Sequence, residues 1–121
     1  MSPAKKSKSK SKSKKAKKDN TIELLDGVGA NPSEQPAKKN TPNGPGDRVR
    51  WWNKTDRGHT IEFDAWPFAE APRAILVEAG HKSDWFTIYV NGLSGRYGYT
   101  IEPTINPASG PPDAPGILVG D

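Results

Sequence analysis

All ten aromatic residues of this 121-residue chain lie between Trp51 and Tyr99. A hydrophobic core is built mainly from large apolar side chains, so we expect the core to come from residues 47–121. That length is short but sufficient for one small domain. Only 32% of the whole chain is apolar, which agrees with a protein that folds over part of its length.

Residues 1–19 form a segment of lysine and serine that we expect to be a disordered tail. Dense lysines repel one another, and the segment offers almost nothing apolar to bury. Residues 1–18 carry a charge of +9, whereas residues 19–121, with nine basic and 14 acidic residues, carry −5. The nine lysines of the tail are Lys5, Lys6, Lys8, Lys10, Lys12, Lys14, Lys15, Lys17 and Lys18.

These lysines predict contact with nucleic acid or another polyanion, because clustered cations release counterions from phosphates. The tail has no Arg for base readout and no aromatic residue for base stacking. Such binding would therefore be independent of sequence. Three other roles stay open for the tail: a solubilising segment, an anchor on anionic lipids, or a nuclear-import signal.

Residues 20–46 are expected to hold a first strand, at 21–25, followed by a loop or linker rich in Pro and Gly. From residue 47 onwards, apolar and polar residues alternate in short runs bounded by turn residues, which is typical of β-strands. On the first of these runs, Val49 and Trp51 share one phase, opposite to Trp52. About seven strands of this kind predict an all-β Greek-key sandwich.

Five segments resemble, in this order, the cupredoxin family of the plastocyanin and azurin type. They are 46–53 (GDRVRWWN), 59–63 (HTIEF), 77–80 (VEAG), 95–99 (GRYGY) and 116–119 (GILV). The first is similar to a Gly-Asp turn that opens a strand, and the second to the strand that begins with a copper-ligating His. The fourth is similar to the strand that leads into the copper loop. The resemblance implies a cupredoxin-like sandwich over residues 47–121, with 21–25 as a candidate first strand.

The resemblance also implies that the copper site is lost. The Cys ligand would fall at Ile101, no His follows in residues 103–105, and the only Met is Met1. Blue copper needs a thiolate and two imidazoles. We therefore expect no metal, no cofactor and no electron transfer.

His59 is the one ligand position that keeps its residue. Its two interpretations are a metal-binding or pH-sensitive imidazole, and a histidine held at a strand start by a bond to a loop. We favour the second, because a lone imidazole binds metals weakly. A metal site shared with His81 is disfavoured, since the family places that turn away from the copper end.

Trp52, Trp85 and Tyr89 lie in the phase opposite to the expected core. An exposed face would make them an aromatic patch for a protein or carbohydrate partner. The alternative, which we favour, is a second apolar face covered by the N-terminal segment or by the loop at 66–68. That loop, Trp-Pro-Phe, is itself expected to be buried as a plug between strands.

No catalytic constellation is visible, so we expect a non-catalytic protein. The chain has no Cys and only two His, and its paired acids fall on the solvent phase of strands. No window approaches the about 18 apolar residues of a membrane-spanning helix, and no apolar stretch follows the basic start. We therefore expect a cytoplasmic protein, or one associated with a nucleoid or nucleus, that does not span a membrane. The sequence does not set the oligomeric state.

Overall fold

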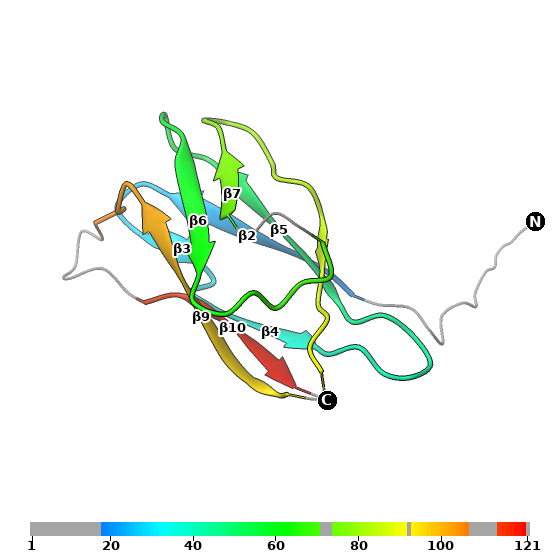
Figure 1. Cartoon of the computed structure of the whole chain (residues 1–121). Coiled ribbons are helices and arrows are strands. Elements are labelled where there is room, and N and C mark those ends of the chain that lie inside the picture. The colour runs from blue at the N-terminus through cyan, green and yellow to red at the C-terminus, as the bar shows by residue number, and fades with distance from the viewer. Residues whose placement is uncertain (1–17, 71–73, 92, 107–113, 121) are drawn as a thin grey trace, which may run out of the picture.

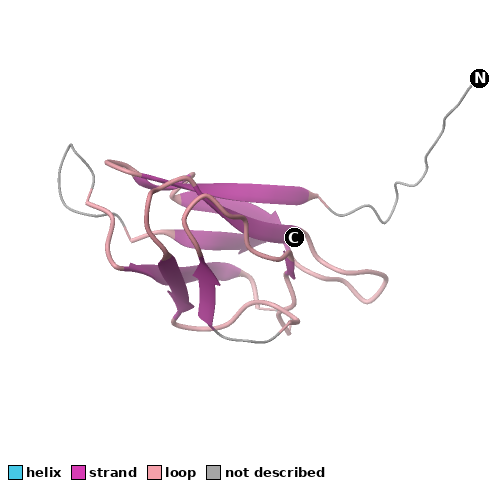
Figure 2. Cartoon of the chain, turned by 90° about the horizontal axis from the view of Figure 1, so that it is seen from above, coloured by secondary structure: helices cyan, strands magenta, loops and turns pink. Residues whose placement is uncertain are grey.

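The computed structural model describes residues 18–70, 74–91, 93–106 and 114–120. The predicted disordered tail, residues 1–19, lies outside the described residues except for Lys18 and Asp19, and Asp19 already belongs to the first strand of the structure. Strands, turns and loops make up the described part, which contains no helix (Figures 1 and 2). None of the described residues therefore forms a helix able to cross a lipid bilayer.

The strands form two sheets that enclose one core, as the sequence predicts (Figures 1 and 2). The core does not begin at residue 47 as expected, because Ile22, Leu24, Ala30 and Ala37 also belong to it. In the four-stranded sheet the order is β3 (Gly29–Asn31), β2 (Asp19–Leu25), β5 (Arg48–Asn53) and β8 (Phe86–Thr87). In the five-stranded sheet it is β4 (Glu34–Lys38), β10 (Gly116–Gly120), β9 (Gly95–Glu102), β6 (His59–Phe63) and β7 (Ala74–Val77).

The alternation seen in the sequence sets which side of each strand is buried. Along β5, every second side chain from Val49 is buried and the intervening ones are partly exposed. Strand β2 has the same period and pairs with β5 in parallel, with Ile22 opposite Trp51. Because successive side chains of a strand point to opposite faces, both strands give one row to the core and one to solvent.

The structure corrects the expected loop over residues 26–46, because this stretch contains β3 and β4. Pro36 lies within β4, which is the outer strand of its sheet and pairs only with β10. A proline is tolerated there because an edge strand leaves half of its backbone donors unpaired. The described residues consequently hold nine strands rather than about seven.

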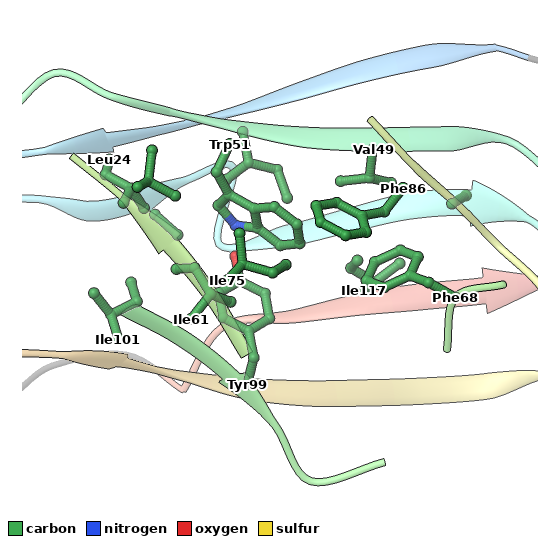
Figure 3. Close-up of a cluster of buried hydrophobic side chains, with 14 of the residues drawn as sticks. Leu24, Val49, Trp51, Ile61, Phe68, Ile75, Phe86, Tyr99, Ile101 and Ile117 are labelled. Carbon is green, nitrogen blue, oxygen red and sulfur yellow. The ribbon is translucent and has the colours of Figure 1, made fainter. Parts of the chain in front are cut away.

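Trp51 stands at the centre of the core (Figure 3). Its ring is fully buried and meets the rings of Phe63, Phe68, Phe86 and Tyr99 edge to face, at centroid distances of 5.5–6.4 Å. Such contacts add to the free energy gained from burying apolar area. The expected plug is confirmed, since Phe68 is buried and belongs to this aromatic cluster.

Candidate functional site

The Gly-Asp motif fixes the point where the chain enters strand β5. A Cβ on Gly46 would lie 2.7 Å from the carbonyl oxygen of Ile88, so only glycine fits against this backbone. The next residue, Asp47, is buried, and its carboxylate accepts hydrogen bonds from the backbone N–H groups of Lys18 (3.0 Å) and Lys38 (2.9 Å). Asp47 thereby joins the start of β2 to the end of β4.

Asn53, at the end of β5, holds the turn that leads to His59. Its fully buried amide donates to the carbonyl oxygens of Arg57 (2.7 Å) and Val77 (2.8 Å). Its carbonyl oxygen accepts from the backbone N–H and the hydroxyl of Thr55, at 2.9 and 2.7 Å. No sequence pattern predicts this role of Asn53, although the residue closes the first segment of the resemblance, 46–53.

His59 opens β6 and is 2% exposed. Its Nδ1 lies 2.8 Å from the carbonyl oxygen of Pro103, which can only accept, so Nδ1 donates. Strands β6 and β9 pair with Thr60 opposite Glu102, which brings the His59 ring to the loop after β9. This geometry is that of a histidine bonded to a loop.

The surroundings of His59 do not fit a copper ion. Its Nε2 is buried and has no hydrogen-bond partner among the described residues. Ile101, at the expected thiolate position, and Ile105 are both buried among apolar side chains. Within the described residues, no three His, Cys, Asp or Glu side chains form a metal-binding group. His81 is exposed in a turn after β7, whereas His59 is buried.

The outer side of the four-stranded sheet combines cations with aromatic rings. The guanidinium groups of Arg48 and Arg50 lie 4.7 and 4.2 Å from the ring centroid of Trp85. The ammonium groups of two lysines lie 4.2 and 4.4 Å from the ring centroid of Trp52. These distances are those of cation–π interactions. We call this surface the cation–aromatic face; its members are Arg48, Arg50, Trp52, Lys54, Lys82 and Trp85.

Two of these four cations are neutralised by acids of β2. Arg48 forms a two-pronged ion pair with Asp19, at 2.8 and 2.7 Å, and this hydrogen-bonded carboxylate raises the pKa of Arg48 above its usual value. Lys54 lies 3.0 Å from a carboxylate oxygen of Glu23. Both pairs are partly exposed to solvent, so each stabilises the fold only slightly.

The other two cations keep their charge uncompensated. Arg50 donates through Nε to the hydroxyl of Thr21, at 3.2 Å. In the part of the chain that the structure describes, neither Arg50 nor Lys82 has a carboxylate partner within ion-pair distance. They are thus the members of the face with charge available to an anionic partner.

The predicted partner residues take different positions. Trp52 and Trp85 are half-buried on the cation–aromatic face, where cations stand over their rings, and Tyr89 is 53% exposed. Among the described residues, none of the three packs against another aromatic ring. A role for them in binding a protein or carbohydrate stays a prediction.

Sequence reasoning missed the cations that surround these rings, although a signal was present. Arg48, Arg50 and Trp52 fall in one phase of β5 and therefore on one face. Lys82 could not be found this way, because it reaches Trp52 through an isolated bridge between the two residues.

Lys18 is the one predicted polyanion-binding lysine within the described residues. Beyond its bond to Asp47, its carbonyl oxygen accepts from the backbone N–H of Arg48, at 2.9 Å. The lysine-rich segment therefore joins the sandwich beside Arg48, a member of the cation–aromatic face. The other eight lysines of the prediction, Lys5 to Lys17, lie outside the described residues.

Comparisons with known proteins bear on the fold. No protein-family model and no curated protein matches the chain. Among solved structures, it is similar to a copper(I) form and an oxidised form of amicyanin variants, each with a TM-score of 0.55. A reduced copper(I) form of a third amicyanin variant gives 0.53. In all three, identity is 17% and the match covers 83% of this chain and 80% of the other. The chain has a cupredoxin-like fold.

Proposed function

We propose that this chain is a non-catalytic, metal-free binding module. The observation that carries the proposal is Ile101, which fills the expected thiolate position with an apolar side chain packed in the core. The bond from His59 to Pro103 supports it further, because it gives that imidazole a structural role. Blue-copper chemistry requires a thiolate that the chain lacks.

Copper titration tests the metal-free part of the proposal. We expect the protein and its His59→Gln variant to bind Cu(II) equally weakly in isothermal calorimetry, with circular dichroism confirming that the variant is folded. The His81→Gln variant is the matched control, because it removes the other imidazole from an exposed turn. Tight, stoichiometric Cu(II) binding that His59→Gln abolishes and His81→Gln preserves would refute the proposal.

The partner that we favour for the module is a nucleic acid, bound independently of sequence by the lysine-rich segment. Residues 1–18 carry nine positive charges and no acid. Lys18 is attached beside Arg48, at the edge of the cation–aromatic face. This partner agrees with the expected location, because a protein in the cytoplasm, nucleoid or nucleus would encounter DNA or RNA.

Fluorescence anisotropy with a labelled 30-nucleotide DNA strand tests this partner. Because binding would release counterions, we expect the affinity to fall at least about 300-fold between 50 and 200 mM salt if six or more lysines make contact with the single strand. A full-length variant with all nine lysines of the tail changed to Gln should lose most of the binding at low salt. Affinity that does not respond to salt, or that survives in this variant, would contradict the role of the tail.

A further inference from the structure

We infer that the cation–aromatic face is a second nucleic-acid contact, in which Arg50 and Lys82 bind backbone phosphates. This inference rests on the proposed nucleic-acid partner and extends it from the tail to the folded domain. Its starting point is the pair of cations without a carboxylate partner on a face whose other two cations are neutralised.

The aromatic rings hold these cations in place before a ligand arrives. The guanidinium of Arg50 lies 4.2 Å from the Trp85 centroid, and the ammonium of Lys82 lies 4.4 Å from the Trp52 centroid. A long side chain that is already ordered loses less conformational entropy when it binds. Arg50 uses Nε for Thr21, and its other guanidinium donors make no bond to the described residues, so they are available to a phosphate.

The position of the face explains why its ligand should be the same one that the tail binds. Lys18 and Arg48 are joined through their backbones at the start of β2 and β5. A polyanion held by the tail therefore reaches Arg48 first and then Arg50, two residues further along the same strand. Binding through both regions would benefit from a high effective concentration, because the first contact delivers the ligand to the second.

The chemistry of the face favours a nucleic acid over a membrane or a sugar. A membrane-binding surface inserts apolar side chains, but the exposed aliphatic residues Val28, Leu76, Leu93 and Leu118 are not members of the face, and cations stand over both of its tryptophans. Cations stand over Trp52 and Trp85, which leaves less open ring surface for stacking on a sugar. The phosphates of a nucleic acid carry the negative charge that Arg50 and Lys82 would neutralise, so a nucleic acid matches the charge of the face.

The test compares two full-length double variants that remove the same charge. Arg50→Gln/Lys82→Gln changes the face, whereas Arg57→Gln/Lys38→Gln removes one exposed arginine and one exposed lysine that are not members of it. Anisotropy is measured with labelled single-stranded DNA, RNA of the same sequence and duplex DNA. We expect the face variant to bind about three- to tenfold more weakly than the control. We also expect the plot of log affinity against log salt concentration to be shallower for the face variant than for the control, by about 1.4 in slope on single strands.

Each outcome separates the inference from the proposed function. Equal affinities and salt slopes of the two double variants would overturn the inference and leave the tail as the only contact. An absence of salt-dependent binding by the wild-type protein would overturn the nucleic-acid function itself. The face variant could instead lose affinity only for vesicles of anionic lipid and not for oligonucleotides. That result would overturn the inference in favour of a membrane. Restored affinity in Arg50→Lys/Lys82→Arg would support a contact made by charge.

Discussion

Trp51 and Trp52 are neighbours on one strand, yet they belong to two different parts of the molecule. Trp51 is fully buried and surrounded by aromatic rings (Figure 3), whereas Trp52 is half-buried between the ammonium groups of Lys54 and Lys82. The same side chain thus stabilises a core in one position and orders surface cations in the next. The difference arises because successive residues of a strand face opposite sides of the sheet.

Trp51 belongs to the residues that stabilise the fold, whereas Trp52 belongs to the residues that are available to a binding partner. Burial of Trp51 removes apolar surface from water and adds four edge-to-face contacts. The surroundings of Trp52 add cation–π interactions at a partly exposed site, which contribute much less to stability. Substitutions should therefore act on stability in the first position and chiefly on binding in the second.

The largest expected effect is that of Trp51→Ala. Loss of a fully buried indole leaves a cavity at the centre of the aromatic cluster and should lower the free energy of unfolding by about 3–5 kcal/mol. Urea denaturation followed by circular dichroism measures this change without relying on tryptophan fluorescence. Trp51→Phe, which keeps a ring in the core, should cost clearly less; equal losses from both substitutions would show that the cavity is not the cause.

A second effect should appear at high pH, through the ring that packs against Trp51. Burial raises the pKa of Tyr99 to about 12 from its usual value of 10; the facing Trp51 N–H lowers it in part without forming a regular hydrogen bond. Because the folded state holds the neutral phenol more strongly than the unfolded chain, stability is complete below pH 10 and falls as the pH rises towards 12. The loss attributable to Tyr99 should be about 2–3 kcal/mol.

Tyr99→Phe is the control for this pH effect. The variant lacks the titrating group, so its stability should fall less than that of the wild type between pH 10 and 12. At neutral pH it should be as stable as the wild type or up to about 1 kcal/mol more stable, because the hydroxyl is buried without a hydrogen-bond partner. Parallel pH profiles of the two proteins would show that other groups cause the alkaline loss.

The smallest expected effect on stability is that of Trp52→Ala, about 1 kcal/mol, because its ring is partly solvated. The same substitution frees Lys54 and Lys82 from the ring and should weaken nucleic-acid binding by less than the loss of Arg50 and Lys82 does, because every charge of the face remains. Denaturation and anisotropy on one preparation measure both quantities. A loss of stability as large as that of Trp51→Ala would remove the distinction between the two tryptophans.

Prediction from the sequence succeeded where a side chain's environment depends on local alternation. The inward phase of Val49 and Trp51 follows from a two-residue period that any strand must obey. Strand β4 was missed because Pro36 argues against a strand unless that strand lies at a sheet edge. The position of a strand within a sheet depends on its partners, which single-sequence patterns do not specify.

The candidate site also has one part that follows from the sequence and one part that follows only from the fold. The loss of copper ligands can be read from the sequence, because Ile101 cannot supply a thiolate whatever its surroundings. The bond from His59 to Pro103 joins residues that are 44 positions apart, so only the pairing of β6 with β9 creates it.

The sequence by itself determined that the aromatic residues of the core lie after residue 50, that the large positive charge lies before residue 19, and that the sandwich lacks a set of copper ligands. These are properties of composition and order, which do not depend on how the chain folds. Only the tertiary structure decided that Lys82 meets Trp52 and that Arg48 and Arg50 share Trp85. These contacts depend on strand register, which is set by the packing of the whole sandwich rather than by neighbours in the sequence.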